Sequence, residues 1–473
     1  MAHYDTIVIG AGLAGLAAAI RTAHFGKSVR LFETHTAIGG LNSWYKRNGR
    51  VIDVGLHALT NFVPESDRSA PLNRILRQLR IKRSELELVP QDHSDIVFPD
   101  NTLRLNNDFE AFRAQIAEQF PDDIDGFDEL VKVVRAQAYS GEPLPYSSTQ
   151  VELSEYIMDQ RLIDMLCMPV MYYGNPCEED MDFQPFCTMF QSILIEGFAR
   201  PRHGMKQFLE VLQTHLEQEG GELTLGCRIR KVTTSGGRVC GVIDENGEEY
   251  TADAIVAAVD AIEVAHLIGR ENLEPSNPFF SLLANWEDTL EYLPRHSFVE
   301  GIFELPRPVR DYGLTASVTF LCNAEDFQYF APESFNSPFE HILVCAPGNY
   351  PGCDEEANIL RLSGMTDADE WIHAIPREEY LAQKQTVAKG LKKALAKRYP
   401  KLAADAKYLD LFTPHTIAHF TDKMRGGIYG GRVKFKDFQT GYPNMLIAGT
   451  DQGLLGIVGA MLSGIIAANT LMK

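Results

Sequence analysis

The stretch Tyr4-Asp5-Thr6-Ile7-Val8-Ile9-Gly10-Ala11-Gly12-Leu13-Ala14-Gly15 decides the fold of this chain. Its first half is a short, mostly β-branched run that is typical of a buried parallel strand. Its second half is a G-x-G-x-x-G loop, and the alanine-rich residues 16–22 that follow favour a helix. The order of strand, glycine loop and helix predicts a site for the pyrophosphate of a dinucleotide.

Each glycine of this loop is required for a different geometric reason. The backbone turns sharply at Gly10, approaches the pyrophosphate at Gly12 and lets the helix pack against the strand at Gly15. The helix start, at Leu13 and Ala14, offers free amides and a positive dipole end to the phosphates. We therefore expect all five residues to belong to the nucleotide site.

An acidic residue follows the second expected strand. Residues 28–32 read as that strand, and Glu33 comes directly after it, about 20 residues beyond the glycine loop. A carboxylate there hydrogen-bonds a ribose diol and disfavours the 2′-phosphate of NADP. The residues of this segment are compatible with either NAD or FAD as the dinucleotide.

Composition excludes several classes of protein. The 473 residues are 45% apolar and 23% charged, which indicates a soluble globular protein of two or three structural units. Acidic residues number 64 against 44 basic ones, so the net charge of −20 has the wrong sign for a nucleic-acid partner. The eight cysteines form no C-x-x-C pair, which predicts no metal site and a reduced, cytoplasmic protein.

Two further glycine-containing motifs resemble the flavoprotein superfamily of amine oxidases and phytoene desaturases. Gly39-Gly40-Leu41 follows the ribose acid, and the segment 50–57 ends in His57. Near the other terminus, the strand-like residues 444–451 are followed by a glycine-rich helix start at 456–464. The resemblance implies that FAD is the cofactor and that these segments contact it.

The resemblance also implies roles for the C-terminal element. Gly449 and Asp451 are expected at the ribityl-phosphate chain, and Gly456, Val458 and Gly459 at the helix start that faces the flavin. A helix N-terminus there stabilises the negative charge of a reduced flavin. The apolar run 454–472 is then a buried, flavin-facing helix, although its length approaches that of a membrane span.

The middle of the chain resembles a third block of the same superfamily. After a helix at 206–219 and two strands, the resemblance implies that the backbone of Val232 lies against the adenine. We therefore predict an α/β fold with a discontinuous, Rossmann-like FAD-binding domain and an α+β substrate domain of mixed or antiparallel sheet plus helices. The FAD-binding domain takes residues 1–75, 200–260 and 410–473, and the substrate domain takes 76–199 and 261–409.

The substrate domain is rich in apolar segments. Residues 187–198 and 279–286 are either ordinary core or the lining of a long tunnel or a membrane-facing surface, for which the helical part 76–199 is the candidate. The motifs at 412–416 and 426–431 resemble phytoene desaturases, carotenoid isomerases and retinol saturases. This resemblance implies an enzyme with a hydrophobic small-molecule substrate and peripheral contact with the inner face of a membrane.

The function that follows is FAD-dependent desaturation, saturation or isomerisation of a long apolar polyene, isoprenoid or lipid chain. His57, His415 and Tyr429 are the candidate catalytic residues, and the electron acceptor is either a quinone or O₂. An amine or protoporphyrinogen oxidase that uses O₂ is the alternative enzyme. A flavin-bound scaffold or lipid carrier without turnover is the non-enzymatic alternative.

Overall fold

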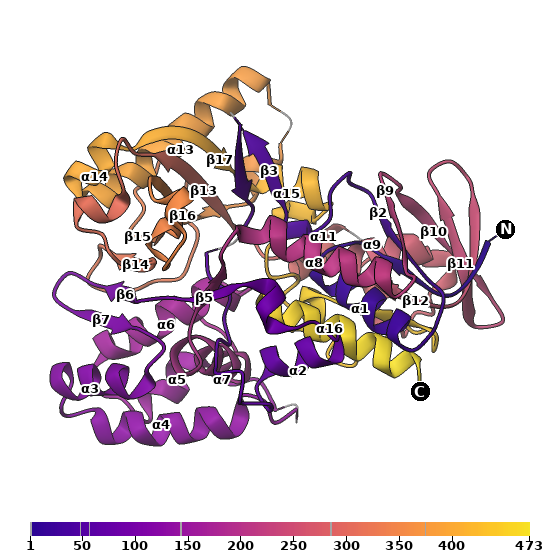
Figure 1. Ribbon diagram of the computed structural model, residues 1–473, viewed down its shortest axis with the longest axis horizontal. Helices are drawn as coiled ribbons and strands as arrows, with labels where there is room; N and C mark the ends of the chain where they lie inside the picture. Colours follow the sequence, from indigo (N-terminus) through magenta and orange to yellow (C-terminus); the bar gives the residue numbers. More distant parts are fainter. Residues whose placement is uncertain (1, 48, 56, 142–143, 284–285, 374) are drawn as a thin grey trace.

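The computed structural model describes residues 2–47, 49–55, 57–141, 144–283, 286–373 and 375–473. Leu56 of the predicted segment 50–57 and residues 284–285 of the apolar segment 279–286 lie outside the described residues. Two sheets organise the chain, and Figure 1 shows them in opposite halves of an elongated molecule. The fold is α/β, with one Rossmann-like parallel sheet and one mostly antiparallel sheet, as predicted.

The first sheet is built from three distant parts of the chain. Its parallel strands run in the order β18, β12, β1, β2, β9, and the antiparallel pair β10–β11 extends it beside β12. The bounds are β1 Ala2–Ile9, β2 Val29–Glu33, β9 Glu222–Leu225, β10 Ile229–Ser235, β11 Arg238–Asp244, β12 Glu249–Ala257 and β18 Met445–Ile447. The discontinuous nucleotide-binding sheet that the sequence predicts is therefore present.

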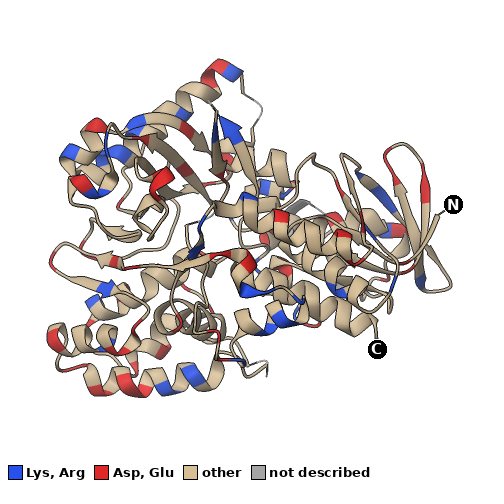
Figure 2. Ribbon diagram, viewed as in Figure 1, with Lys and Arg blue, Asp and Glu red and all other residues tan. Residues whose placement is uncertain are grey.

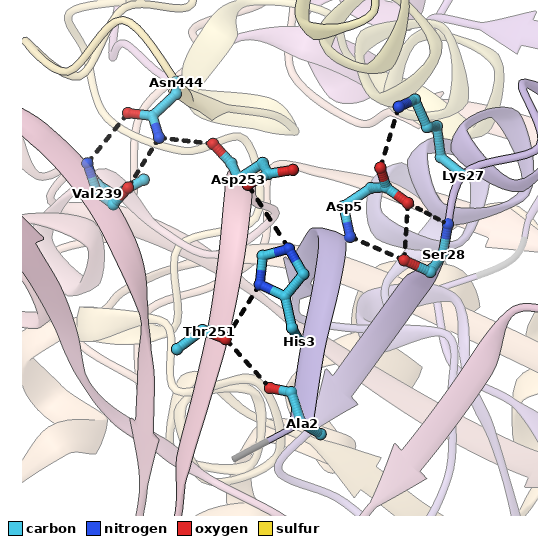
Figure 3. A network of polar contacts seen from close by, with 9 residues as sticks. All are labelled: Ala2, His3, Asp5, Lys27, Ser28, Val239, Thr251, Asp253 and Asn444. Atoms are coloured by element: carbon cyan, nitrogen blue, oxygen red, sulfur yellow. Dashed lines mark hydrogen bonds and ion pairs between the residues drawn. The ribbon is translucent and has the colours of Figure 1, made fainter.

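Polar side chains tie these distant strands together at the sheet ends (Figure 3). The Asn444 amide donates to the backbone oxygens of Val239 and Asp253, at 2.8 and 2.7 Å. On β1, the carboxylate of Asp5 accepts from the Ser28 backbone amide at 2.8 Å and pairs with Lys27 at 3.0 Å. These bonds satisfy backbone groups that the short strand β18 and the strand ends would otherwise leave open.

Two helices pack against each other beside this sheet. They are α1, Leu13–His24, and α16, Gly456–Leu471, which come from opposite ends of the chain (Figure 1). A Cβ atom at Gly464 would lie 1.9 Å from the backbone oxygen of Ala14, so the helices meet at a distance that only glycine permits. The apolar run at 454–472 is therefore a packed helix of the nucleotide-binding half.

The second sheet runs in the order β17, β13, β16, β15, β14, β6, β7, and only β14–β6 is a parallel pair. Its bounds are β6 Ser94–Val97, β7 Thr102–Leu105, β13 His296–Glu304, β14 Val318–Cys322, β15 His341–Cys345, β16 Ile359–Asp367 and β17 Lys407–Phe412. Strand β16 is buried along its whole length because helix α13, Arg377–Ala396, covers one face and the other face meets helices and a cavity.

A cluster of helices lies against this sheet, at the lower left of Figure 1. Its members are α3 Phe109–Gln119, α4 Ile124–Gln137, α5 Thr149–Ser154, α6 Gln160–Gly174 and α7 Phe183–Phe190. Figure 2 shows acidic and basic residues interspersed on the exposed helices. None of the helices in the described part of the chain combines the length and apolarity that crossing a membrane requires.

Shorter elements connect these layers. They are β3 Trp44–Arg47, β4 Arg50–Asp53, β5 Leu88–Pro90, β8 Ala199–Pro201, α2 Pro71–Gln78, α8 Gly204–Gln218, α9 Ala261–Ile268, α10 Pro278–Ser281, α11 Trp286–Tyr292, α12 Asp369–Ile372, α14 Pro400–Asp405 and α15 Pro414–Thr421.

Candidate active site

A cavity of about 320 Å³, the main cavity, extends from the glycine loop of the first sheet to the face of the second sheet. Its nucleotide side is lined by the ends of β1 and β2 and by the start of α16. Its other side, the apolar arm, is lined by residues of α6, β13, β15 and β16. The carboxyl ends of parallel strands are where open α/β sheets bind ligands.

The glycine loop has the geometry that a pyrophosphate needs. Gly10 has φ of 94°, and a Cβ atom at Gly15 would lie 1.8 Å from the backbone oxygen of Gly10. A Cβ atom at Gly12 would meet nothing within 4 Å, although Gly12 lines the cavity. Gly10 and Gly15 therefore hold the turn against the helix, and Gly12 leaves room for a ligand.

Glu33 lines the cavity at the end of β2, where the ribose acid is expected. One of its oxygens accepts from the backbone amide of Ala11 at 2.7 Å, and the other accepts from that of His35 at 2.9 Å. The carboxylate therefore fixes the glycine loop, and its remaining lone pairs can accept the hydroxyls of a ribose.

The adenine contact of the Val232 backbone stays a prediction, and the structure places the Val232 side chain away from the main cavity. Val232 is fully buried within the sheet, and it is absent from the described residues that line the cavity. Cys227, Arg228 and Ile229, at the start of β10, line the cavity instead. Ile229 stands three residues before Val232, so the start of β10 is the part of this strand that faces the cavity.

The C-terminal end of α15 covers this same part of the cavity. Asp422 accepts two hydrogen bonds from the Arg228 guanidinium, at 2.6 and 2.7 Å. The ring of Phe420 lies 5.5 Å from that of His35. Both segments line the cavity, so a salt bridge and a ring contact close α15 over its nucleotide side.

A buried ion pair lies next to this cover. Lys423 Nζ is 2.6 Å from Asp260 Oδ1 and 3.3 Å from Thr450 Oγ1, and all three residues line the cavity. Burial raises the pKa of Asp260 to about 6, although the Lys423 charge opposes the shift. Sequence reasoning missed this pair because neither residue stands in a recognisable motif.

The prediction for Asp451 is corrected. Its carboxylate accepts from the backbone amides of Ala261 at 2.8 Å and Gly431 at 2.6 Å. Asp451 is buried and is not among the described residues that line the cavity. It anchors the start of α9 and the 426–431 loop, while Thr450 and Gly449 take the cavity-facing positions.

Some of the remaining predicted cofactor residues line the main cavity and others do not. Besides Glu33 and the loop glycines Gly10 and Gly12, the predicted residues that line the cavity are Leu13, Ala14, Gly39, Gly40, Leu41, His57, Gly449 and Gly456. Val458 and Gly459, like Gly15, are absent from the described lining residues. Val458 packs in the core, and Ile457 and Ala460 line the cavity in its place because they lie on the other face of α16.

His57 lies in the cavity wall beside two residues of the second sheet. Its Nε2 is 3.2 Å from Glu300 Oε1 and 3.1 Å from Ser363 Oγ. Glu300, on β13, also accepts a hydrogen bond from buried Arg361 on β16. Burial alone would raise the pKa of Glu300, but the Arg361 and His57 charges and their hydrogen bonds lower it to about 2.

These contacts fix the hydrogen bonding of the imidazole. Because the Glu300 carboxylate only accepts, His57 Nε2 carries a proton and donates it. Among the described residues, none hydrogen-bonds to His57 Nδ1. Sequence reasoning missed Glu300 and Ser363, which stand in ordinary strand patterns more than 240 residues from His57.

The apolar arm of the cavity is lined by aromatic and aliphatic side chains. They are Tyr172, Tyr173, Phe298, Leu343, Ile428 and Tyr429. The Tyr429 hydroxyl donates to the backbone oxygen of Tyr172, and burial raises the pKa of Tyr429. Tyr429 therefore stays neutral, and its hydroxyl is engaged with the cavity wall.

The prediction for His415 is wrong in its location. His415 is exposed on α15, where its ring lies 5.2 Å from that of Tyr380, and it is absent from the described lining residues. The same helix brings Ile417 and Phe420 to the cavity. The helical period, which the motif does not reveal, turns His415 away.

A parallel sheet with a glycine loop, next to a second sheet that carries an apolar arm, is the architecture of a dinucleotide-binding protein. The chain belongs to the flavin containing amine oxidoreductase family, whose pattern matches residues 13–472. Its cofactor is therefore FAD, and the open position at Gly12, the engaged carboxylate at Glu33 and the start of α16 fit that dinucleotide.

Relatives within this family act on carotenoids. The chain is 24% identical to a chloroplastic prolycopene isomerase of Arabidopsis thaliana, over 96% of this chain and 76% of the relative. It is 27% identical to a zeta-carotene-forming phytoene desaturase of Myxococcus xanthus, over 54% of this chain and 53% of the relative. A crystal structure of an oxidoreductase from Methanosarcina mazei shares the fold, with a TM-score of 0.65 and 16% identity over 98% of this chain and 99% of that one.

Proposed function

We propose that this flavoenzyme desaturates, saturates or isomerises a long apolar polyene or isoprenoid chain. The observation that carries the proposal is the apolar arm, whose aromatic and aliphatic walls lead from the nucleotide side of the main cavity to the second sheet. Such a lining removes an apolar chain from water and binds it through the apolar surface area that is buried, and not through charge. The carotenoid relatives support the same substrate class.

In this proposal His57 is the acid–base group. Bound FAD supplies hydride acceptance or, in its reduced form, hydride donation. His57 Nδ1 is the nitrogen that exchanges a proton with a substrate carbon, because Nε2 is engaged by Glu300 and Ser363. Glu300 is a positioning residue, since it orients the imidazole and is itself held by Arg361.

The alternative, an oxidase of amines or porphyrinogens, finds less support in the apolar arm. An alkylammonium substrate needs a carboxylate that is free to pair with it. Glu300 lines the arm, but it is already paired with Arg361 and with His57. An amine would therefore have to displace a buried ion pair, which is costly.

The experiment that tests this function is anaerobic incubation of the holoprotein, oxidised and reduced, with polyenes in liposomes. Phytoene, prolycopene and all-trans-retinol form the panel, and products are analysed by mass and by isomer composition. Loss of hydrogen identifies a desaturase, gain a saturase, and altered geometry at constant mass an isomerase. Unchanged polyenes together with oxidation of putrescine or protoporphyrinogen under O₂ would reject the proposal in favour of the alternative.

A further inference from the structure

A second cavity lies on the same face of the second sheet as the apolar arm. It has a volume of about 280 Å³, and its floor includes Phe339, His341 and Met365. Its rim includes the exposed residues Asp326 and Gln328. The main cavity does not share these residues, so the two cavities have separate walls.

The register of the second sheet makes the two cavities neighbours. Phe298 of the main cavity pairs directly with Met365 of the second across β13 and β16. On β15, Leu343 lines the main cavity, and His341, two residues earlier on the same face, lines the second. The boundary between the two spaces therefore crosses one face of this sheet, between Phe298 and Met365 and between Leu343 and His341.

The Tyr172–His341 pair is a direct contact between the walls of the two cavities. Tyr172, from α6, lines the main cavity, and its hydroxyl lies 2.7 Å from Nδ1 of His341 in the second cavity. The Tyr172 ring also packs edge-on against the His341 ring, with centroids 5.6 Å apart. Two further rings support the pair, Tyr329 at 6.2 Å from Tyr172 and Phe327 at 5.0 Å from His341.

The hydrogen bonds of this pair define its state. His341 Nε2 is 2.9 Å from the backbone oxygen of Gln328, which only accepts, so Nε2 carries the proton. Burial lowers the pKa of His341 to about 4, so the imidazole is neutral and Nδ1 accepts from the Tyr172 hydroxyl. The Tyr172 hydroxyl also lies 3.3 Å from the backbone oxygen of His341, so the pair is held by neutral hydrogen bonding, whose net contribution to stability is modest.

We propose that the Tyr172–His341 pair is a partition that opens to let the far end of a long apolar chain extend from the main cavity into the second cavity. This inference rests on the proposed function and adds a determinant of chain length to it. The exposed carboxylates of Asp326 and Glu340 on the rim repel an anionic end group, so the chain end that enters is uncharged.

The first test measures whether the cavities join, and it needs no substrate. In the holoprotein, quenching of flavin fluorescence by acrylamide is expected to rise in Tyr172→Ala and to stay at the wild-type level in Tyr172→Phe, which keeps the ring. Gln328→Trp fills the second cavity and leaves the backbone oxygen that His341 uses, so Tyr172→Ala/Gln328→Trp should return to the wild-type level. Equal quenching in Tyr172→Ala and wild type, or no reversal by Gln328→Trp, would overturn the partition.

The second test measures chain length through flavin absorbance changes on titration with prolycopene or with the shorter all-trans-retinol. Gln328→Trp is expected to weaken prolycopene binding roughly tenfold and to leave retinol binding unchanged, since only the long chain loses buried area. Glu333→Trp, an exposed change in the same loop, is the matched control. Equal effects of Gln328→Trp on both ligands would overturn the inference. If the quenching test gives the expected pattern but no polyene binds, the proposed function is rejected and the partition stands.

Discussion

Glu300 and His57 meet at 3.2 Å in the wall of the main cavity, although 243 positions separate them in the chain. The contact joins the segment that follows β4 to the middle of β13, and it therefore bridges the nucleotide-binding half and the second sheet. Because Arg361 already neutralises Glu300, the carboxylate can orient His57 without creating an unpaired buried charge.

Substitutions of the three predicted catalytic residues should have different effects on kcat. Replacing His57 by Gln should lower kcat roughly 100-fold or more, because a general acid–base group contributes about that much. His415→Gln should leave kcat unchanged, since His415 is exposed and away from the cavity. Tyr429→Phe should change kcat only slightly because its hydroxyl binds the protein backbone. Equal losses in the two histidine variants would contradict the assignment, with flavin content as the control for folding.

Removing the Glu300 carboxylate should destabilise the protein. In Glu300→Gln the buried Arg361 loses its ion pair with Glu300, which costs about 3 kcal/mol of unfolding free energy. Urea denaturation of the holoprotein measures this loss. Ser363→Ala, which removes only the hydroxyl beside His57, is the matched control and should cost about 1 kcal/mol. A Glu300→Gln variant as stable as the control would argue against the buried ion pair.

The same carboxylate predicts how stability depends on pH. The pKa of Glu300 falls from an ordinary 4.5 to about 2 in the folded protein, so its contribution is complete above about pH 4.5. As the pH falls from 4.5 towards 2, the folded state loses this contribution, whose full size is about 3 kcal/mol. Unfolding free energies measured across this window should therefore fall more steeply for the wild type than for Glu300→Gln. Parallel curves would be inconsistent with the lowered pKa.

Alanine substitutions at two glycines of one loop should have different effects, one on FAD binding and the other on stability. Gly12→Ala should fold normally and bind FAD more weakly, because its Cβ meets no protein atom and enters the space of the ligand. Gly15→Ala should lower the thermal stability of the apoprotein itself, since its Cβ would lie 1.8 Å from the Gly10 oxygen. Fluorescence titration with FAD and thermal unfolding of both apoproteins distinguish the two. A stable Gly15→Ala protein with normal FAD affinity would refute the tight contact.

The cover formed by α15 should slow the release of FAD. Asp422→Ala removes the salt bridge to Arg228, and FAD dissociation should accelerate by a few-fold, since a partly exposed pair contributes up to about 1 kcal/mol. High salt should accelerate release from the wild type and affect the variant less. Glu129→Ala, which removes an exposed ion pair on α4, is the matched control. An unchanged dissociation rate in Asp422→Ala would show that α15 does not retain the cofactor.

The sequence predicted the nucleotide side of the cavity well because its signals are local. Gly10, Gly12 and Glu33 act through backbone geometry within a few residues of a strand end, so spacing alone places them. Errors began where a side chain could face either of two directions. Asp451 stands in the right segment, but its hydrogen bonds with the amides of Ala261 and Gly431 hold its carboxylate away from the cavity.

The apolar arm could not be predicted in the same way. Glu300, Phe298 and Ser363 meet because β13 and β16 pair at a particular register, and no short motif encodes pairing between segments about 60 residues apart. Their strands read as ordinary buried strands. The domain division stays a prediction, with the FAD-binding domain at residues 1–75, 200–260 and 410–473 and the substrate domain in between. Strands β6 and β7, which lie within 76–199, belong to the second sheet.

The close crossing at Gly464 and Ala14 has a consequence for biosynthesis. Because α1 emerges from the ribosome first and α16 emerges about 440 residues later, the nascent chain holds an exposed apolar face of α1 through most of translation. The second sheet is complete once β17 has been made, before α16 exists. The wall of the main cavity that the start of α16 provides therefore forms only after the glycine loop, β13 and α15 have all been synthesised.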